Sequence, residues 1–276
     1  MKNLNLISKI FEKEISIGFK GKRKESFKLA KKIKEQLHRE NKNYLLINLK
    51  EISEKKIKKK TLFVSDLFGK RITQDKNKNR VLIVTPNLKI LKKNNGNLKE
   101  NIRYHQTNTG GSIHTDGPQK NKTPNILIMS CINNAKKGGH TILIDANKIY
   151  SEIKKKKPKY IKELSKDFFF ERRGFNFTKN YLNKPILKKT KKNINFRYLR
   201  EYIISGYQKA KKKITINQLN SINYLDKIMH QNKIQKKIKM KKGDLIIINN
   251  KNTAHGRTNF IIDNKNPRKF MRIWTN

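Results

Sequence analysis

The stretch that decides the fold is GSIHTDGP, residues 111–118, in which one residue separates His114 from Asp116. Side chains two positions apart in a β-strand point to the same side of the sheet. A strand over 111–116, ended by Gly117-Pro118, would therefore aim an imidazole and a carboxylate at one point. The spacing predicts a strand that offers two metal ligands on one face.

A second histidine, His255, lies far along the chain and is followed by Arg268 and Arg272. If a distant strand brings His255 to the first pair, two imidazoles and one carboxylate occupy one side of a metal ion. Three positions then stay open, which is the facial arrangement of non-haem Fe(II) sites. The arginines offer a place for an acidic molecule beside the metal. The alternative is a surface histidine and a turn aspartate before Gly-Pro.

Composition narrows the class of protein. No apolar run approaches the roughly 18 residues that a membrane helix needs, and residues 1–19 contain Glu12 and Glu14 and lack the apolar region of a signal peptide. The single cysteine, Cys131, excludes an internal disulfide and fits a reducing compartment, so we expect a cytoplasmic protein. Cys131 itself is expected to be a small buried residue within a strand over 126–131.

The net charge of +48 raises the question of nucleic-acid binding. Only 12 of the 68 basic residues are arginines, the usual readers of phosphates and bases. The lysines stand in short scattered runs, and no aromatic residues interleave with them as a stacking surface requires. A solvated surface enriched in lysine by AT-rich codons is therefore favoured over a nucleic-acid partner. Electrostatic attraction of anionic substrates stays open.

The order of elements favours one domain, 1–276, since the chain has no internal repeat and no Gly/Ser/Pro-rich linker. An amphipathic helix is predicted over 26–38. Strands are predicted at 44–49, 61–64, 81–85, 111–116, 126–131, 141–144, 168–170, 234–240, 245–248 and 268–274, and helices near 147–164, 197–210 and 216–231. Strands at both ends that enclose a helical insert at about 146–232 indicate a β-sandwich or jelly roll rather than a parallel α/β sheet.

Three segments together resemble one known family. They are 111–118, the Gly138-Gly139-His140-Thr141 turn, and 249–258 with its Asn-Asn and His-Gly-Arg-Thr, followed by Arg268 to Trp274. In this order they are similar to the TauD/TfdA-like Fe(II)- and 2-oxoglutarate-dependent dioxygenases. The match runs over roughly residues 100–276 and is looser over 1–99. It implies a mainly β fold with α: a double-stranded β-helix (a cupin-like jelly roll) with a helical insert and an N-terminal helix.

The resemblance also implies roles for individual residues. His114, Asp116 and His255 would bind iron, while Thr141 and Arg268 would bind the distal carboxylate of 2-oxoglutarate. Arg272, four residues further along the strand, would share the face of Arg268 and meet an anionic group of the primary substrate or support the co-substrate. Arg257 either lines the site or pairs with an acid in a loop.

The implied activity uses Fe(II), 2-oxoglutarate and O₂ to hydroxylate an unactivated C–H of a small polar or biosynthetic molecule, with release of succinate and CO₂. Desaturation and cyclisation are variants, and homo-oligomerisation stays open. Residues 104–109, 175–177 and 197–207 are expected to face the open side of the metal. The competing classes are a lysine-rich nucleic-acid-binding protein and a catalytically inactive β-barrel that only binds.

Overall fold

The computed structural model describes residues 11–16, 23–39, 43–86, 107–110, 112–173, 177–191 and 193–276. Besides the helical residues 11–16, its helices are α2 (Arg23–Arg39), α3 (Glu54–Leu67), α5 (Ala146–Lys156), α6 (Pro158–Leu164), α7 (Arg200–Lys209), α8 (Ile216–Met229) and the 3₁₀ turn η2 (Asn232–Ile234). Its strands are β1 (Tyr44–Asn48), β2 (Val81–Val84), β3 (Ile126–Asn133), β4 (Thr141–Asp145), β5 (Asp167–Glu171), β6 (Tyr181–Pro185), β7 (Leu187–Lys189), β8 (Ile194–Phe196), β9 (Lys236–Ile238), β10 (Asp244–Asn249), β11 (Thr253–Arg257) and β12 (Lys269–Thr275).

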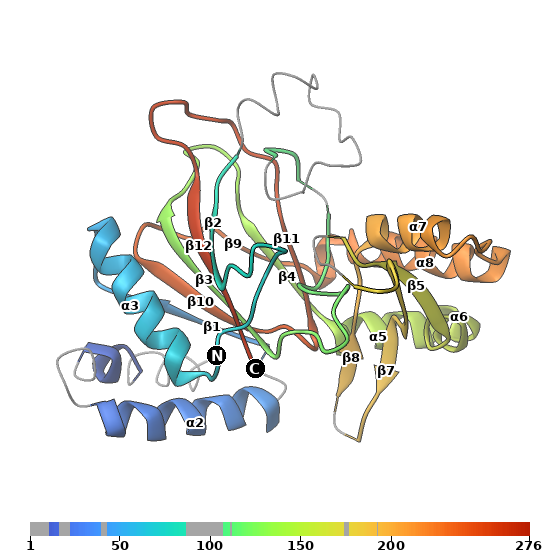
Figure 1. Ribbon diagram of the computed structural model, residues 1–276, viewed down its shortest axis with the longest axis horizontal. Coiled ribbons are helices and arrows are strands. Elements are labelled where there is room, and N and C mark those ends of the chain that lie inside the picture. The colour runs from blue at the N-terminus through green and yellow to red at the C-terminus, as the bar shows by residue number, and fades with distance from the viewer. Residues whose placement is uncertain are drawn as a thin grey trace.

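Two antiparallel sheets form the centre of the molecule (Figure 1). The larger has the strand order β1-β10-β3-β12-β2, and the smaller has the order β11-β4-β9. Every strand pairing in the described part of the chain is antiparallel. The expectation of antiparallel sheets in a mixed β and α protein, rather than a parallel α/β sheet, is confirmed.

Three apolar clusters fill the spaces between the two sheets and between each sheet and the helices that cover it. Alternation along β12 puts Phe270 and Trp274 in an inner cluster that also contains Leu143 of β4, so this cluster lies between the two sheets. Met271 and Ile273 point the other way and pack in the cluster that includes residues of α2 and α3. The outer face of the smaller sheet packs against α5 to α8 (Figure 1). His255, opposite Leu143 in the pairing of β11 with β4, and Trp274 of β12 lie on the inner side of this arrangement.

One expected strand is wrong, because residues 61–64 lie inside helix α3. Thr61 to Val64 alone is rich in β-formers, but the buried residues Ile57, Lys60, Thr61, Val64 and Leu67 recur every three or four positions. That period places them on one face of a helix. The composition of these four residues favoured a strand, but the spacing of buried positions over the longer segment is that of a helix.

Two further expectations need correction. Residues 112–116 form no extended strand; His114 makes an isolated bridge to His255, and the Thr115 N–H donates to the Tyr198 carbonyl at 2.9 Å. The insert also contains more strands than the single one expected at 168–170. Besides its helices it contains two antiparallel hairpins, β5–β6 and β7–β8. The remaining predicted elements are present with bounds shifted by a few residues, and the long helix near 147–164 is broken between Lys156 and Pro158.

Features outside the site agree with the sequence. Cys131 is buried within β3, and burial raises the pKa of its thiol to about 12. The lysine runs are mostly exposed, although Lys60 is buried and its ammonium contacts the Leu49 carbonyl and Glu51. No helix among the described segments is long and apolar enough to cross a membrane.

Candidate metal centre

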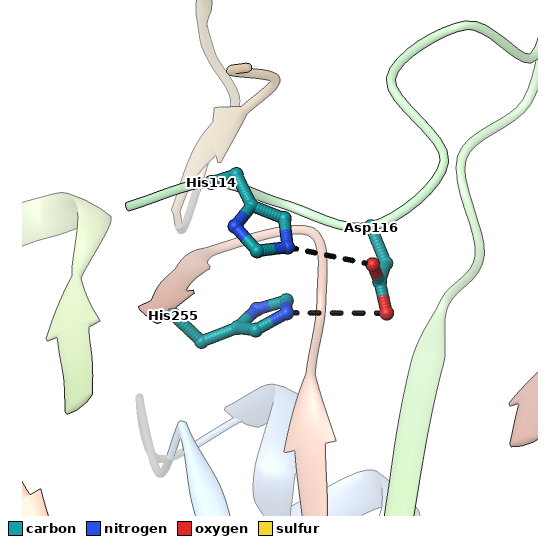
Figure 2. A group of neighbouring side chains, drawn as sticks. All are labelled: His114, Asp116 and His255. Carbon is teal, nitrogen blue, oxygen red and sulfur yellow. Dashed lines mark ion pairs between the residues drawn. The ribbon is translucent and has the colours of Figure 1, made fainter. Parts of the chain in front are cut away.

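The two histidines of the predicted ligand set lie opposite each other. The His114 N–H donates to the His255 carbonyl at 2.8 Å, and the His255 N–H donates back to the His114 carbonyl at 2.7 Å. This reciprocal pair is an antiparallel bridge, so both side chains leave the backbone on the same side. Their ring centroids are 4.6 Å apart (Figure 2).

Asp116 completes the cluster (Figure 2). Its Oδ1 is 3.7 Å from His114 Nε2, and its Oδ2 is 3.9 Å from His255 Nε2. One ligand atom from each of the three residues lies within 4.8 Å of the other two. Two imidazoles and one carboxylate on one side of a shared point are the donor set that non-haem Fe(II) uses. The residues present therefore fit such an ion.

The surroundings of the two imidazoles suit metal binding. His114 Nδ1 is 3.1 Å from the Ser112 carbonyl oxygen, which can only accept a hydrogen bond. Nδ1 therefore donates to this carbonyl, which leaves Nε2, the ring nitrogen nearer Asp116, as the one that would bind a metal. Burial, assisted by the neighbouring His114, lowers the pKa of His255 to about 3. His255 is consequently neutral at physiological pH, as a metal ligand must be.

The Asp116 carboxyl is held ionised. Burial alone would raise its pKa, but the positive charge of Arg272 and the contact with His114 outweigh burial, and the pKa lies well below its usual range. Arg272 Nη1 donates to Oδ1 at 3.1 Å, and the Trp274 indole N–H donates to Oδ2 at 2.8 Å. Only 4% of Asp116 is exposed. A carboxylate in this state needs no deprotonation before it binds a cation.

The Asp116 backbone is fixed by the side chain of Asn250, in the turn between β10 and β11. The Asp116 N–H donates to Asn250 Oδ1 at 2.8 Å, and Asn250 Nδ2 donates to the carbonyls of Asp116 and Pro124, both at 3.0 Å. Asp116 itself lies in no strand, so the Asn250 amide makes the backbone hydrogen bonds that strand pairing would otherwise supply. Because the same turn leads into β11, Asn250 ties Asp116 to the strand that carries His255.

Replacing Asn250 with aspartate should weaken metal binding. The carboxylate keeps an acceptor for the Asp116 N–H, but loses the donor and faces two carbonyl oxygens. We expect the free energy of unfolding to fall by about 1–3 kcal/mol for each buried acceptor left without a donor. The metal affinity should fall on the order of 10–100-fold, the usual effect of losing a residue that orients a ligand. Calorimetric titration with Co(II) measures this.

Asn249→Asp is the matched control for Asn250→Asp. Asn249 is the preceding residue and is equally buried, but its Oδ1 accepts from the Lys251 N–H, a bond that aspartate preserves. Wild-type Co(II) affinity in Asn250→Asp would show that the amide does not orient Asp116.

Arg272 is held in place by Gln74, a buried residue that precedes β2. Arg272 Nε donates to Gln74 Oε1 at 2.9 Å, and Gln74 Nε2 donates to the backbone carbonyls of Arg272 and Arg80. The guanidinium therefore lies between Gln74 and Asp116. Arg272 is on the inner face of β12, as expected, but its nearest anion is the Asp116 carboxylate.

The other predicted site residues gather around Phe260. The Arg268 guanidinium lies 3.9 Å from the Phe270 ring centroid and 5.6 Å from that of Phe260, and the Arg257 guanidinium lies 4.9 Å from Phe260. Arg257 is opposite Thr141 in the pairing of β11 with β4. Gly139, two residues before Thr141, borders Arg268, because a Cβ there would be 3.5 Å from Arg268 Nε.

Two details of these residues were not expected. Arg257 belongs to strand β11 and not to a loop, and its Nη2 donates to the backbone carbonyl and hydroxyl of Thr107. The Thr141 hydroxyl contacts Met240 Sδ at 3.6 Å. Thr141, Arg257 and Arg268 are all buried. The structure thus brings Thr141 and the two arginines to one region of the inner face. His255 lies next to this region, because it belongs to the same strand as Arg257.

The segments that were expected to face the open side of the metal make other contacts or lie outside the described residues. Arg197 donates to the carbonyls of Pro118 and Lys120, Tyr198 donates to Asp226, and Tyr207 donates to Gln218. The two tyrosines thus bond within the insert, and Arg197 bonds the insert to the segment 118–120. Residues 104–106 and 175–176 lie outside the described part of the chain, and Phe177 packs under the Arg172 guanidinium.

Four functional neighbours were missed from the sequence: Gln74, Asn250, Phe260 and Trp274. Asn250 and Trp274 lie inside the segments that carried the resemblance, so their positions relative to His255 and Arg272 were a usable signal. Gln74 and Phe260 lie in irregular segments without periodicity. Nothing local marks them.

Comparison with known proteins gives a family match. The family model described as "Taurine catabolism dioxygenase TauD, TfdA family" matches residues 11–274. No curated protein sequence matches the chain.

Solved structures share the fold. Asparagine oxygenase in complex with Fe(II), 2S,3S-3-hydroxyasparagine and succinate aligns with a TM-score of 0.69 at 12% identity, covering 100% of this chain and 91% of that one. The non-heme iron oxygenase OrfP with Fe and alpha-ketoglutaric acid aligns with a TM-score of 0.65 at 12% identity, covering 92% and 80%. OrfP has also been solved with Fe, succinate and (3S)-hydroxy-L-Arg, and aligns with a TM-score of 0.64 at 12% identity, covering 90% and 83%.

Proposed function

Because this chain belongs to the TauD, TfdA family of dioxygenases, we propose that it hydroxylates an unactivated C–H of a small amino acid or a similarly small anionic molecule. Family membership makes the protein a 2-oxoglutarate-dependent non-haem iron dioxygenase, with Fe(II), 2-oxoglutarate and O₂ as its cofactor and co-substrates. When bound, the iron and 2-oxoglutarate supply the oxidising chemistry, with release of succinate and CO₂. The observation that carries the proposal is the clustering of His114, Asp116 and His255.

In this proposal the three clustered residues hold the iron. Both histidines turn Nε2 towards the carboxylate, His114 has a carbonyl partner for Nδ1, and Asp116 is ionised. His255 and Asp116 are therefore in the protonation states that a ligand requires. These residues would contribute three ligands to the ion and would leave its other positions open.

Arg268 and Thr141 are proposed to grip the distal carboxylate of 2-oxoglutarate. A planar guanidinium binds a carboxylate through two parallel hydrogen bonds, which lysine cannot do. The stacking of Arg268 on Phe270, and its proximity to Phe260, restricts the plane in which its N–H groups point. Burial keeps water from competing for those N–H groups.

Arg272 is proposed to receive an anionic group of the primary substrate. Its bonds to Gln74 and Asp116 use two of its five N–H donors. The hydroxylated amino acids bound by asparagine oxygenase and OrfP support an amino acid as the substrate, whose carboxylate would meet this guanidinium. Arg257, bonded to Thr107, is proposed to form the wall of the site rather than to bind substrate.

We also propose that the chain is a single domain, 1–276, with a double-stranded β-helix at its centre. The two facing antiparallel sheets, the insert after β4 and the N-terminal helix α2 support this. The family match over residues 11–274 and the alignment of the whole chain with asparagine oxygenase favour one unit over two.

The test is succinate release from 2-oxoglutarate with Fe(II) and ascorbate, against a library of amino acids and small sulfonates. We expect at least one amino acid to raise succinate release well above the substrate-free rate and to gain one oxygen atom by mass spectrometry. Absence of succinate release with every candidate, in a protein that binds Fe(II), would contradict the proposed substrate class. The His114→Ala variant supplies the background.

The high positive charge should have little to do with catalysis. Random DNA is expected to bind weakly and to lose affinity steeply, on the order of 10³-fold or more between about 50 and about 200 mM salt if several phosphates are contacted. Succinate release should not change when DNA is added. Fluorescence anisotropy with labelled duplexes measures the binding. Tight, sequence-selective binding at physiological salt would favour the nucleic-acid class instead.

A further inference from the structure

The only tryptophan of the chain touches the metal cluster. Trp274 lies near the end of β12, is 2% exposed, and its indole N–H donates to Asp116 Oδ2 at 2.8 Å. Oδ2 is also the oxygen that faces His255 Nε2 (Figure 2). A carboxylate oxygen has two lone-pair positions, so Oδ2 can accept from the indole and still face a cation.

Trp274 and Arg272 act on the carboxylate as a pair. They are two residues apart on the same face of β12, and each donates to a different oxygen of Asp116. Two donors from one rigid strand fix the plane of the carboxylate, and rotation about its last bond would break both hydrogen bonds. The carboxylate is thus oriented before any metal arrives.

Packing fixes the indole in turn. Trp274 is opposite Leu127 in the pairing of β12 with β3, belongs to the apolar cluster between the sheets, and has the Arg272 guanidinium 5.0 Å from its ring centroid. Its backbone carbonyl accepts from the Ile72 N–H at 3.0 Å. These contacts fix the orientation of the indole ring and therefore the direction of its N–H.

We propose that Trp274 is a positioning residue for Asp116, and that its fluorescence reports whether the metal site is filled. The inference rests on the proposed function, since it takes Asp116 to be a ligand. The indole N–H orients the carboxylate for the ion, and an ion bound to that carboxylate lies one hydrogen bond away from the only indole of the protein.

The first experiment is a titration of metal-free wild-type protein with Co(II), followed by tryptophan fluorescence and in parallel by calorimetry. The paramagnetic ion is expected to quench the emission in step with the binding isotherm, to saturation at one ion per chain. Asp116→Ala keeps the tryptophan but should show no saturable quenching. Calorimetric binding without any change in the emission of the wild type would overturn the inference.

The second experiment compares Trp274→Phe with Leu127→Ala by calorimetry with Co(II) and by thermal unfolding without metal. Phenylalanine keeps an aromatic ring but removes the N–H, so the Co(II) affinity is expected to fall on the order of 10–100-fold. Leu127→Ala damages the same apolar cluster without touching Asp116. Both variants should lower the melting temperature, but only Trp274→Phe should weaken the metal.

The outcomes separate the two proposals. If the wild type binds no Co(II) or Fe(II), the proposed function fails. If the wild type binds Co(II) and Trp274→Phe binds it equally well, the proposed function stands and the role of Trp274 is wrong. Equal loss of affinity in Trp274→Phe and Leu127→Ala would assign the effect to packing and also contradict the inference. If Trp274→Phe does not fold, the fluorescence titration of the wild type decides.

Discussion

The variants His114→Ala and Asp116→Ala are expected to bind no Fe(II) at one equivalent per chain and to reduce succinate release to background. Each removes one of the three protein ligands, and two ligands cannot hold the ion in the facial arrangement. Asp116→Ala also removes the anion that compensates Arg272, which should cost about 3–5 kcal/mol of stability. A domain with a stability of about 10 kcal/mol, the middle of the ordinary range, would remain folded. His114→Ala, whose side chain is 13% exposed and not charge-paired in the same way, should cost less.

Metal analysis, succinate release and circular dichroism check this result. His230→Ala is the matched control, because His230 is an exposed histidine at the end of α8. It should keep one Fe(II) and full activity. Stoichiometric iron in Asp116→Ala would refute the assignment of the ligands.

Arg268→Ala should raise the Michaelis constant for 2-oxoglutarate more than any other substitution among the arginines. It would leave the distal carboxylate without a charged partner in a buried region, at a cost on the order of 2–5 kcal/mol, or roughly 30- to several-thousand-fold in affinity. Thr141→Ala removes a single hydrogen bond to a charged group and should cost about 1.5–3 kcal/mol. Arg268→Lys should recover only part of the loss, because the ammonium lacks the planar pair of donors.

Arg272→Ala serves as the comparison for Arg268→Ala. Since Arg272 bonds to Asp116 and not to the Phe260 region, the loss should appear in the Fe(II) requirement and in coupling to the primary substrate. The 2-oxoglutarate Michaelis constant at saturating Fe(II) should change little. If Arg272→Ala weakens 2-oxoglutarate more than Arg268→Ala does, the two arginines have been assigned the wrong way round.

The sequence predicted those features of the site that depend on residues close together along the chain. His114 and Asp116 are two residues apart, so the expected alternation put them on one side; the structure brings them together through one bridge at His114 and the Asn250 side chain at Asp116. Arg268 and Arg272 were placed on one face of the last strand for the same reason, although the strand begins at Lys269 with a register shift beside it. Helix α3 shows the limit of a short window, because the β-forming residues Thr61, Phe63 and Val64 were outweighed by a helical repeat of buried positions that extends on both sides.

The sequence by itself determined which functional groups the site could contain: two imidazoles, one carboxylate and two arginines of the last strand, at spacings that match one family. Only the tertiary structure decided how that carboxylate is held. Gln74, Asn250 and Trp274 reach Asp116 or its partner Arg272 from a loop, a turn and a strand that are distant from residue 116 in the chain. The directions of their hydrogen bonds follow from the packing of two sheets, and no periodicity along the chain encodes them. For that reason the sequence could place Arg272 on the inner face of the strand but could not predict its contact with the carboxylate of Asp116.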